Sequence, residues 1–218
     1  MNRVWTFGDS FTFGHGCRPE GPNSEYYYKY KTESDAVWPE LFGEMLGMEV
    51  KNFGKCGASN DFIIDSVIEN WDNFRERDYV IIGITYHNRF DVPLRDPHSL
   101  KQKLTSIFWD WDKFVFDDIR SQYTLEERKC IINFQYYFSN NELYKIRYLK
   151  RLNFLNKLLK ERNINSFLWD VDFYQHTSRF EKIADATNGE IEDYHFSFKG
   201  HKDFANILYK KIVSQNLI

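Results

Sequence analysis

A serine and a histidine far apart in the chain have the residue types and neighbours that nucleophilic chemistry needs. Ser10 follows Gly8-Asp9 directly after an apolar run, and His195 follows Asp193 by two positions. A serine in a tight turn after a strand presents its hydroxyl and its backbone N–H, as an acyl-transfer nucleophile requires. An imidazole can accept the serine proton, and a carboxylate on its other nitrogen can fix the tautomer. These residues predict a serine nucleophile with a histidine base.

Short β-rich runs alternate with longer helical runs along the chain. Apolar patterns predict strands at about 4–9, 49–53, 79–84 and 166–171, with a weak strand signal at 131–137. Helices are expected from Pro39 to a stop at Gly47, from Ser59 or Asn60 to Trp71, at 143–159 and at 202–213. The polar, aromatic stretch up to about residue 35 is expected to be a loop. The alternation predicts an α/β fold in which helices flank both faces of a parallel sheet.

Ligands of such a sheet bind at the carboxyl ends of its strands. Ser10, Gly57 and Thr85 each fall just past the end of an expected strand. These three positions, which are distant in sequence, are therefore expected to converge on one edge of the sheet.

Length, charge and cysteine content limit the class of protein to which the chain can belong. The 218 residues suggest one domain over 1–218, and the poorly patterned stretch at about 91–140 is expected to be an insertion that acts as a lid or as a structural elaboration. With 29 Lys and Arg against 32 Asp and Glu, the net charge of −3 does not favour nucleic acid or an anionic membrane as partner. Three cysteines without C-x-x-C spacing and no apolar signal run predict a cytoplasmic protein of undetermined oligomeric state.

Four sequence blocks together resemble the SGNH, or GDSL-type, hydrolases, and the resemblance spans nearly the whole chain. Gly8-Asp9-Ser10 matches the first block of that family, and Asn52 followed by Gly57 matches the second. His195 is followed by Gly200 and by His201 at the family's usual distances. The resemblance implies a flavodoxin-like α/β/α sandwich and a Ser-His-Asp/Glu triad.

The third and fourth blocks depart from the family pattern. Thr85 stands where the third block has an asparagine, with Arg89 shortly after it, as in a variant branch of the family. The resemblance implies an oxyanion hole made by the N–H groups of Ser10 and Gly57 and a side chain, for which Thr85, Asn60 and Asn88 are the candidates. The triad acid is Asp193 or Glu192; Asp193 is favoured, and Glu192 has the usual spacing of three.

The remaining candidates concern substrate contacts. Asp9, His87 and Arg89 are expected near the same cleft; Arg89 suits an anionic group or a structural salt bridge. His15 and Cys17 lack partners at metal-like spacing, so neither a metal nor another cofactor is expected. The resemblance implies an esterase for a short acyl group, such as acetyl on a carbohydrate or small molecule. An O-acyltransferase with the same triad and an inactive glycan- or protein-binding domain are the alternatives.

Overall fold

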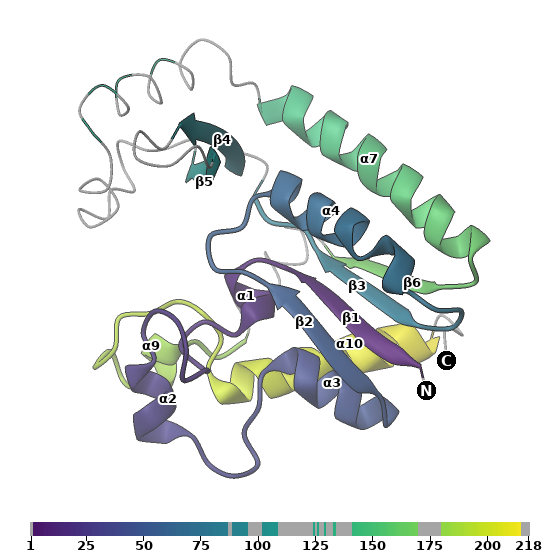
Figure 1. Ribbon diagram of the computed structural model, residues 1–218. Helices are drawn as coiled ribbons and strands as arrows, with labels where there is room; N and C mark the ends of the chain where they lie inside the picture. Colours follow the sequence, from purple (N-terminus) through teal and green to yellow (C-terminus); the bar gives the residue numbers. More distant parts are fainter. Residues whose placement is uncertain are drawn as a thin grey trace.

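A computed structural model of the chain describes residues 2–86, 89–95, 102–108, 141–169 and 180–214, together with the single positions 124, 126, 129 and 133. Most of these residues form one parallel sheet with helices on both sides (Figure 1). The strands are β1 (Arg3–Gly8), β2 (Glu49–Gly54), β3 (Tyr79–Gly83), β4 (Arg89–Arg95), β5 (Gln102–Phe108) and β6 (Asn165–Trp169). The helices are α1 (Ser10–Phe13), α2 (Glu25–Tyr30), α3 (Trp38–Leu46), α4 (Asn60–Glu69), η1 (Trp71–Asn73), α7 (Asn141–Glu161), α9 (Ile183–Ala186) and α10 (Phe198–Ser214).

The sheet has the strand order β2-β1-β3-β6, and each neighbouring pair is parallel. The order reverses at β1, because β2 lies on one side of it and the later strands lie on the other. A sheet of this kind binds ligands at the carboxyl end of the strands where the order reverses. The predicted α/β sandwich with a parallel sheet is confirmed.

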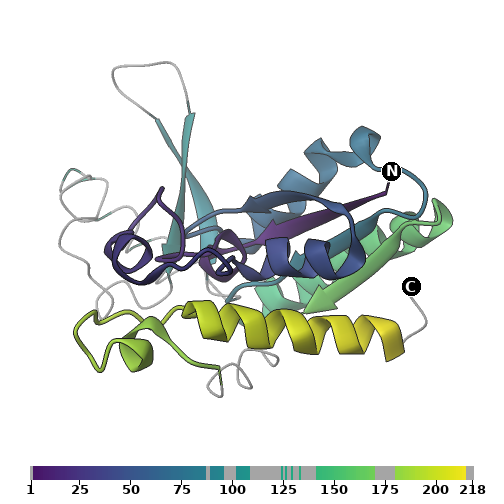
Figure 2. The same ribbon diagram turned by 90° about the horizontal axis from the view of Figure 1, so that it is seen from below.

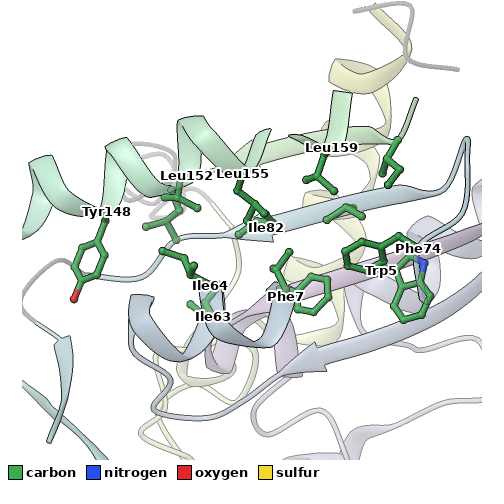
Figure 3. Close-up of a cluster of buried hydrophobic side chains, with 14 of the residues drawn as sticks. Trp5, Phe7, Ile63, Ile64, Phe74, Ile82, Tyr148, Leu152, Leu155 and Leu159 are labelled. Atoms are coloured by element: carbon green, nitrogen blue, oxygen red, sulfur yellow. The ribbon is translucent and has the colours of Figure 1, made fainter. Parts of the chain in front are cut away.

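Side chains alternate between the two faces of the sheet, as the two-residue period of a strand requires. Trp5 and Phe7 of β1 and Ile82 of β3 point toward α4 and α7 (Figure 3). Val4 and Ile81 point to the opposite face, which α3 and α10 cover. All five are buried. Burying such apolar area on both faces fixes the register, since a slip of one residue would exchange the two faces.

Local signals account for the ends of the helices that the sequence predicts. Pro39 stands in the first turn of α3, and Gly47 ends that helix with φ +64°, a conformation that glycine adopts without strain. The Ser59 hydroxyl accepts a hydrogen bond from the N–H of Phe62 at 3.1 Å and caps α4. The helices expected at 143–159 and 202–213 are confirmed and begin earlier, at Asn141 and Phe198.

The stretch between β1 and α3 differs from the prediction, because two short helices interrupt the expected loop. In α1, the Asp9 carboxylate accepts from the N–H of Phe11 at 3.1 Å, and Gly14 ends the turn with φ +92°. In α2, Tyr26 is buried and stacks on Phe198 with ring centroids 5.3 Å apart. A contact with a residue so distant in sequence leaves no local pattern, so the loop prediction was wrong here.

The expected insertion at about 91–140 overlaps an antiparallel hairpin. β4 and β5 pair from Arg89 opposite Phe108 to Arg95 opposite Gln102, and the hairpin extends away from the parallel sheet (Figure 2). Most of the stretch up to residue 140, including all of the strand expected at 131–137 except position 133, lies outside the described residues. The single domain with an insertion stays a prediction.

The described helices also bear on membrane insertion. None of them combines the length and apolarity that crossing a bilayer requires. The cytoplasmic location stays a prediction.

Candidate active site

The carboxyl ends of three parallel strands carry the residues that the sequence singled out. Ser10 begins α1 directly after β1, Gly57 lies in the loop after β2, and Thr85 follows β3 by two residues. Because β1, β2 and β3 are parallel neighbours, these ends share one edge of the sheet (Figure 1). α9 and the loop before α10 lie at the same edge of the sheet (Figure 1), and His195 in that loop is hydrogen-bonded to Ser10.

Ser10 and His195 are hydrogen-bonded although 185 positions separate them in sequence. The distance from Ser10 Oγ to His195 Nε2 is 2.8 Å, and that from His195 Nδ1 to Asp193 Oδ1 is 2.7 Å. The His195 ring also packs against Phe11, with centroids 4.9 Å apart. The geometry has the order hydroxyl, imidazole, carboxylate that activates a serine.

Of the two candidate acids, Asp193 is the one that contacts the imidazole. Asp193 is 4 % exposed, whereas Glu192 is exposed to solvent. Besides the ring of His195, the Asp193 carboxylate accepts from the N–H of His195 at 2.8 Å and from Asn23 Nδ2 at 2.7 Å, and it lies 3.2 Å from His15 Nε2.

These contacts decide the charge of Asp193. Burial alone would raise its pKa, but the hydrogen bonds from His15, His195 and Asn23 outweigh burial, and the pKa lies well below its ordinary range. Asp193 is therefore an anion at every pH at which a neutral imidazole could act as a base.

Gly57 has a backbone conformation that explains the glycine. Its φ is +76°, which L-residues with a side chain rarely adopt, while a Cβ at this position would have open space around it. The need for glycine is thus conformational and not steric. This turn sets the direction of the Gly57 N–H at the edge of the sheet.

Asn52 holds the end of β2 against α1. Its Nδ2 donates to the carbonyl of Thr12 at 2.9 Å, and its Oδ1 accepts from the N–H of Gly54 at 2.8 Å. A Cβ on Gly54 would lie 2.3 Å from the backbone nitrogen of Phe13, so glycine permits this close approach. The second sequence block therefore fixes the position of the serine turn relative to β2.

The loop after β3 is fixed by two of the candidate oxyanion donors. Asn60 donates through Nδ2 to the carbonyl of Thr85 at 3.0 Å and accepts through Oδ1 from the N–H of Thr85 at 2.9 Å. The Thr85 hydroxyl donates to Asp9 Oδ2 at 2.8 Å. Asn60 is 1 % exposed and Thr85 is fully buried. The single hydroxyl proton of Thr85 is thus directed at Asp9 in this arrangement. Asn88, the third candidate, lies outside the described residues.

Asp9 and Arg89, two of the residues expected to contact substrate, are both buried. Asp9 is 1 % exposed and makes the contacts with Phe11 and Thr85 given above. Arg89 is 7 % exposed; its Nη1 donates to the carbonyl of Ala58 at 3.2 Å and lies 3.5 Å from Asp9 Oδ2. These contacts favour the alternative of a structural salt bridge for Arg89. His87 lies outside the described residues.

His201 is buried behind the site. Its Nδ1 accepts from the N–H of Trp38 at 3.3 Å, and burial lowers its pKa to about 3. A neutral, buried histidine that accepts from a backbone N–H has a structural role in α10.

Three residues near the triad were not predicted as site residues, namely His15, Asn23 and Cys56. His15 stacks on His195, with centroids 4.0 Å and planes 21° apart, and its Nδ1 lies 3.5 Å from Cys56 Sγ. The signal in the sequence is a histidine between two glycines, five residues after Ser10. Contact with Asp193 could not be inferred from that spacing.

Among the described residues, His15, Asp193 and His195 form a group of potential metal ligands, since one ligand atom of each lies within 4.8 Å of the others. The two rings are nearly parallel, so their in-plane lone pairs run side by side and do not converge on one point. Ligand nitrogens must point at the metal from about 2.0 Å. The arrangement fits a hydrogen-bonded cluster around one carboxylate better than it fits a metal centre.

Comparison with known proteins gives distant structural likeness. No protein-family model matches the chain, and a search of curated proteins finds no match. Among solved structures, a lipase/acylhydrolase from Enterococcus faecalis is 13 % identical, with a TM-score of 0.41 over 99 % of this chain and 97 % of that chain. A catalytic mutant of an acetylxylan esterase from Geobacillus stearothermophilus is 15 % identical, with a TM-score of 0.37 over 97 % and 94 %.

A member of the lipolytic protein G-D-S-L family from Veillonella parvula DSM 2008 is 13 % identical, with a TM-score of 0.35 over 98 % of this chain and 97 % of that chain. Because identities and scores are low, the chemistry of this chain has to be argued from its own residues.

Proposed function

We propose that the protein is a carboxylic ester hydrolase in which Ser10 is the nucleophile, His195 the general base and Asp193 the triad acid. The observation that carries the proposal is the unbroken line of hydrogen bonds from Ser10 Oγ through His195 to Asp193, at 2.8 and 2.7 Å. Distances in this range allow a proton to pass from the hydroxyl to the imidazole as the serine attacks.

Acylation follows from this geometry. Ser10 Oγ attacks the carbonyl carbon of the ester, and its proton passes to His195 Nε2 while the carbonyl electrons move to oxygen. When the tetrahedral intermediate collapses, the bond to the leaving alkoxide breaks and His195 returns the proton to that oxygen. Water, deprotonated by the same imidazole, then releases the acid and regenerates Ser10. The Asp193 carboxylate stabilises the imidazolium that exists between these transfers.

The developing oxyanion is assigned to backbone donors. The N–H groups of Ser10 and Gly57 belong to turns at neighbouring strand ends, and the backbone of Gly57 is set by its positive φ. Removing one oxyanion donor typically costs about 3 kcal/mol of barrier. The Thr85 hydroxyl and the Asn60 carboxamide are directed at internal partners, so we assign them to holding the loop after β3.

The substrate that we propose is a short acyl ester, such as acetyl on a carbohydrate or small molecule. Two exposed tyrosines directly neighbour site residues in the chain: Tyr194 next to His195 at 68 % exposure, and Tyr86 next to Thr85 at 46 %. Exposed aromatic rings offer flat apolar faces to sugar rings. Their place in the chain next to His195 and Thr85 supports the carbohydrate ester, and an O-acyltransferase would use the same residues.

A fluorophosphonate probe and an ester assay test the proposal. Labelling of the wild type but not of Ser10→Ala, with hydrolysis of p-nitrophenyl acetate lost in both Ser10→Ala and His195→Ala, would support it. A folded wild type that neither labels nor hydrolyses would contradict it and favour the binding domain. Product analysis with a sugar acceptor present distinguishes the acyltransferase, because the acyl group then appears on the sugar and not as free acid.

A further inference from the structure

The Asp193 carboxylate is shared by two imidazoles, of which the proposed triad uses one. Its Oδ1 faces Nδ1 of His195 at 2.7 Å, and its Oδ2 lies 3.2 Å from Nε2 of His15. Asn23 Nδ2 reaches Oδ2 as well, at 2.7 Å. Donors on both oxygens hold the carboxylate from both sides, so its rotation about the last side-chain bond would break contacts with more than one residue.

Each ring nitrogen of His15 faces one partner. Nε2 lies 3.2 Å from Asp193 Oδ2, and Nδ1 lies 3.5 Å from Cys56 Sγ, so the tautomer with its proton on Nε2 has an acceptor for that proton and leaves Nδ1 to accept. Burial raises the pKa of Cys56 to about 11, so the thiol keeps its hydrogen and can donate it to His15. A line of close polar contacts thus runs from Cys56 through His15, Asp193 and His195 to Ser10.

His15 is also held in place by packing. Its ring stacks on that of His195, with centroids 4.0 Å apart, and its side chain is only 11 % exposed. The glycines on either side, Gly14 and Gly16, have φ of +92° and +74°, so the backbone turns sharply on both sides of the histidine. A Cβ on Gly16 would lie 2.4 Å from Ile183 Cδ1. The turn therefore presents the His15 ring to the triad in one orientation.

We propose that His15 is a positioning residue that keeps Asp193 Oδ1 aimed at His195 Nδ1 and supports the face of the His195 ring. The inference rests on the proposed function and deepens it. His15 Nε2 lies 3.2 Å from the outer oxygen of the carboxylate, and the His15 ring lies against the His195 ring that takes up the serine proton. Asn23 supplies a donor to the same oxygen but no support for the ring, so it does not replace His15.

Two variants separate the contacts of His15. His15→Phe keeps a flat ring for stacking and removes both nitrogens, and His15→Ala removes ring and nitrogens together. We expect kcat for p-nitrophenyl acetate, and the rate constant of fluorophosphonate labelling, to fall by about 10-fold in His15→Phe and about 100-fold in His15→Ala, since small misplacements of reacting groups have effects of this size. KM should change by less than about twofold, because His15 is not assigned to substrate binding. Thermal unfolding identifies variants that do not fold.

A readout independent of turnover completes the test. In the Ser10→Ala background, the low-field proton resonance of the hydrogen bond from His195 Nδ1 to Asp193 should shift or broaden when His15→Phe is added. An unchanged resonance, or folded His15 variants with kcat within twofold of the wild type, would overturn the inference. Loss of activity on chelation with recovery on adding Zn²⁺ would also overturn it in favour of a metal centre. An inactive wild type contradicts the proposed function alone, because the resonance still reports on His15.

Discussion

Replacing Asp193 by asparagine tests the triad most sharply, because the variant changes one oxygen to an NH2 group. The carboxylate accepts from ring and backbone nitrogens of His195 on one side and from Asn23 and His15 on the other. An asparagine carboxamide has one acceptor oxygen and one donor NH2 group. Because nitrogen donors face both positions, the NH2 group meets a donor in either orientation of the side chain. With the NH2 group toward His195, Nδ1 becomes an acceptor and Nε2 carries the proton, and this tautomer cannot take a proton from Ser10.

The expected loss is large. An asparagine that imposes the wrong tautomer slows turnover by about 10⁴-fold, which is about 5.4 kcal/mol at 1.36 kcal/mol per tenfold. Each lost hydrogen bond to the charged carboxylate removes about 1.5–3 kcal/mol of stability, so urea unfolding should show a decrease of this order. Single-turnover and steady-state hydrolysis of p-nitrophenyl acetate measure the chemical step.

Glu192→Gln is the matched control, since it makes the same chemical change one residue earlier on an exposed side chain. We expect its kcat to stay within twofold of the wild type. The opposite pattern, with Asp193→Asn within tenfold of the wild type and Glu192→Gln inactive, would refute the assignment of the acid.

Three further predictions concern residues around the site. Gly57→Ala should destabilise the fold by about 1–2 kcal/mol in urea unfolding, because its φ of +76° strains any L-residue while no neighbour obstructs the methyl group; no loss would contradict that φ. Thr85→Val should lose about 1.5–3 kcal/mol of stability with the hydrogen bond to Asp9 but turn over ester within tenfold of the wild-type rate, and a rate loss of about 100- to 1000-fold would instead place Thr85 in the oxyanion hole. Burial lowers the pKa of Lys182 from 10.5 to about 8. Between pH 8 and pH 10.5 the unfolded chain therefore binds more protons than the folded chain, and the free energy of unfolding rises with pH across this range. Lys182→Met should therefore gain more stability over the wild type at pH 7 than at pH 10 in urea titrations, and an equal gain at both would refute the shift.

Elements with local signals could be predicted from the sequence, and those that depend on distant contacts could not. The apolar run from Tyr79 to Gly83 is buried on both faces, as its composition requires, and the Ser59 cap marks the start of α4. Helix α2 has a weak signal only: Tyr26 and Tyr30 are four positions apart and stack, but Tyr27 and Tyr28 between them obscure the helical period, and Tyr26 is held by the distant Phe198. Its stability comes from tertiary packing, which a window of sequence does not contain.

The same distinction applies to the candidate site. The blocks that carry Ser10 and His195 are recognisable by residue type and spacing, and the two side chains are hydrogen-bonded. Spacing alone did not distinguish Asp193 from Glu192 as the candidate acid, since both are close to His195 in sequence. In the structure Asp193 is buried and Glu192 is exposed. The role that we propose for His15 could not be predicted from spacing, because its contact with Asp193 joins two loops that are far apart in sequence.

The 185-residue separation of Ser10 and His195 has a consequence for how the molecule matures. A ribosome that has translated β1, β2 and β3 has already made Ser10, yet the imidazole that we propose as its base is encoded after all four strands of the parallel sheet. In the proposed mechanism, growing polypeptides and fragments that end before His195 lack the general base for ester hydrolysis. Hydrolysis would then report only molecules in which His195 has been synthesised and has reached Ser10.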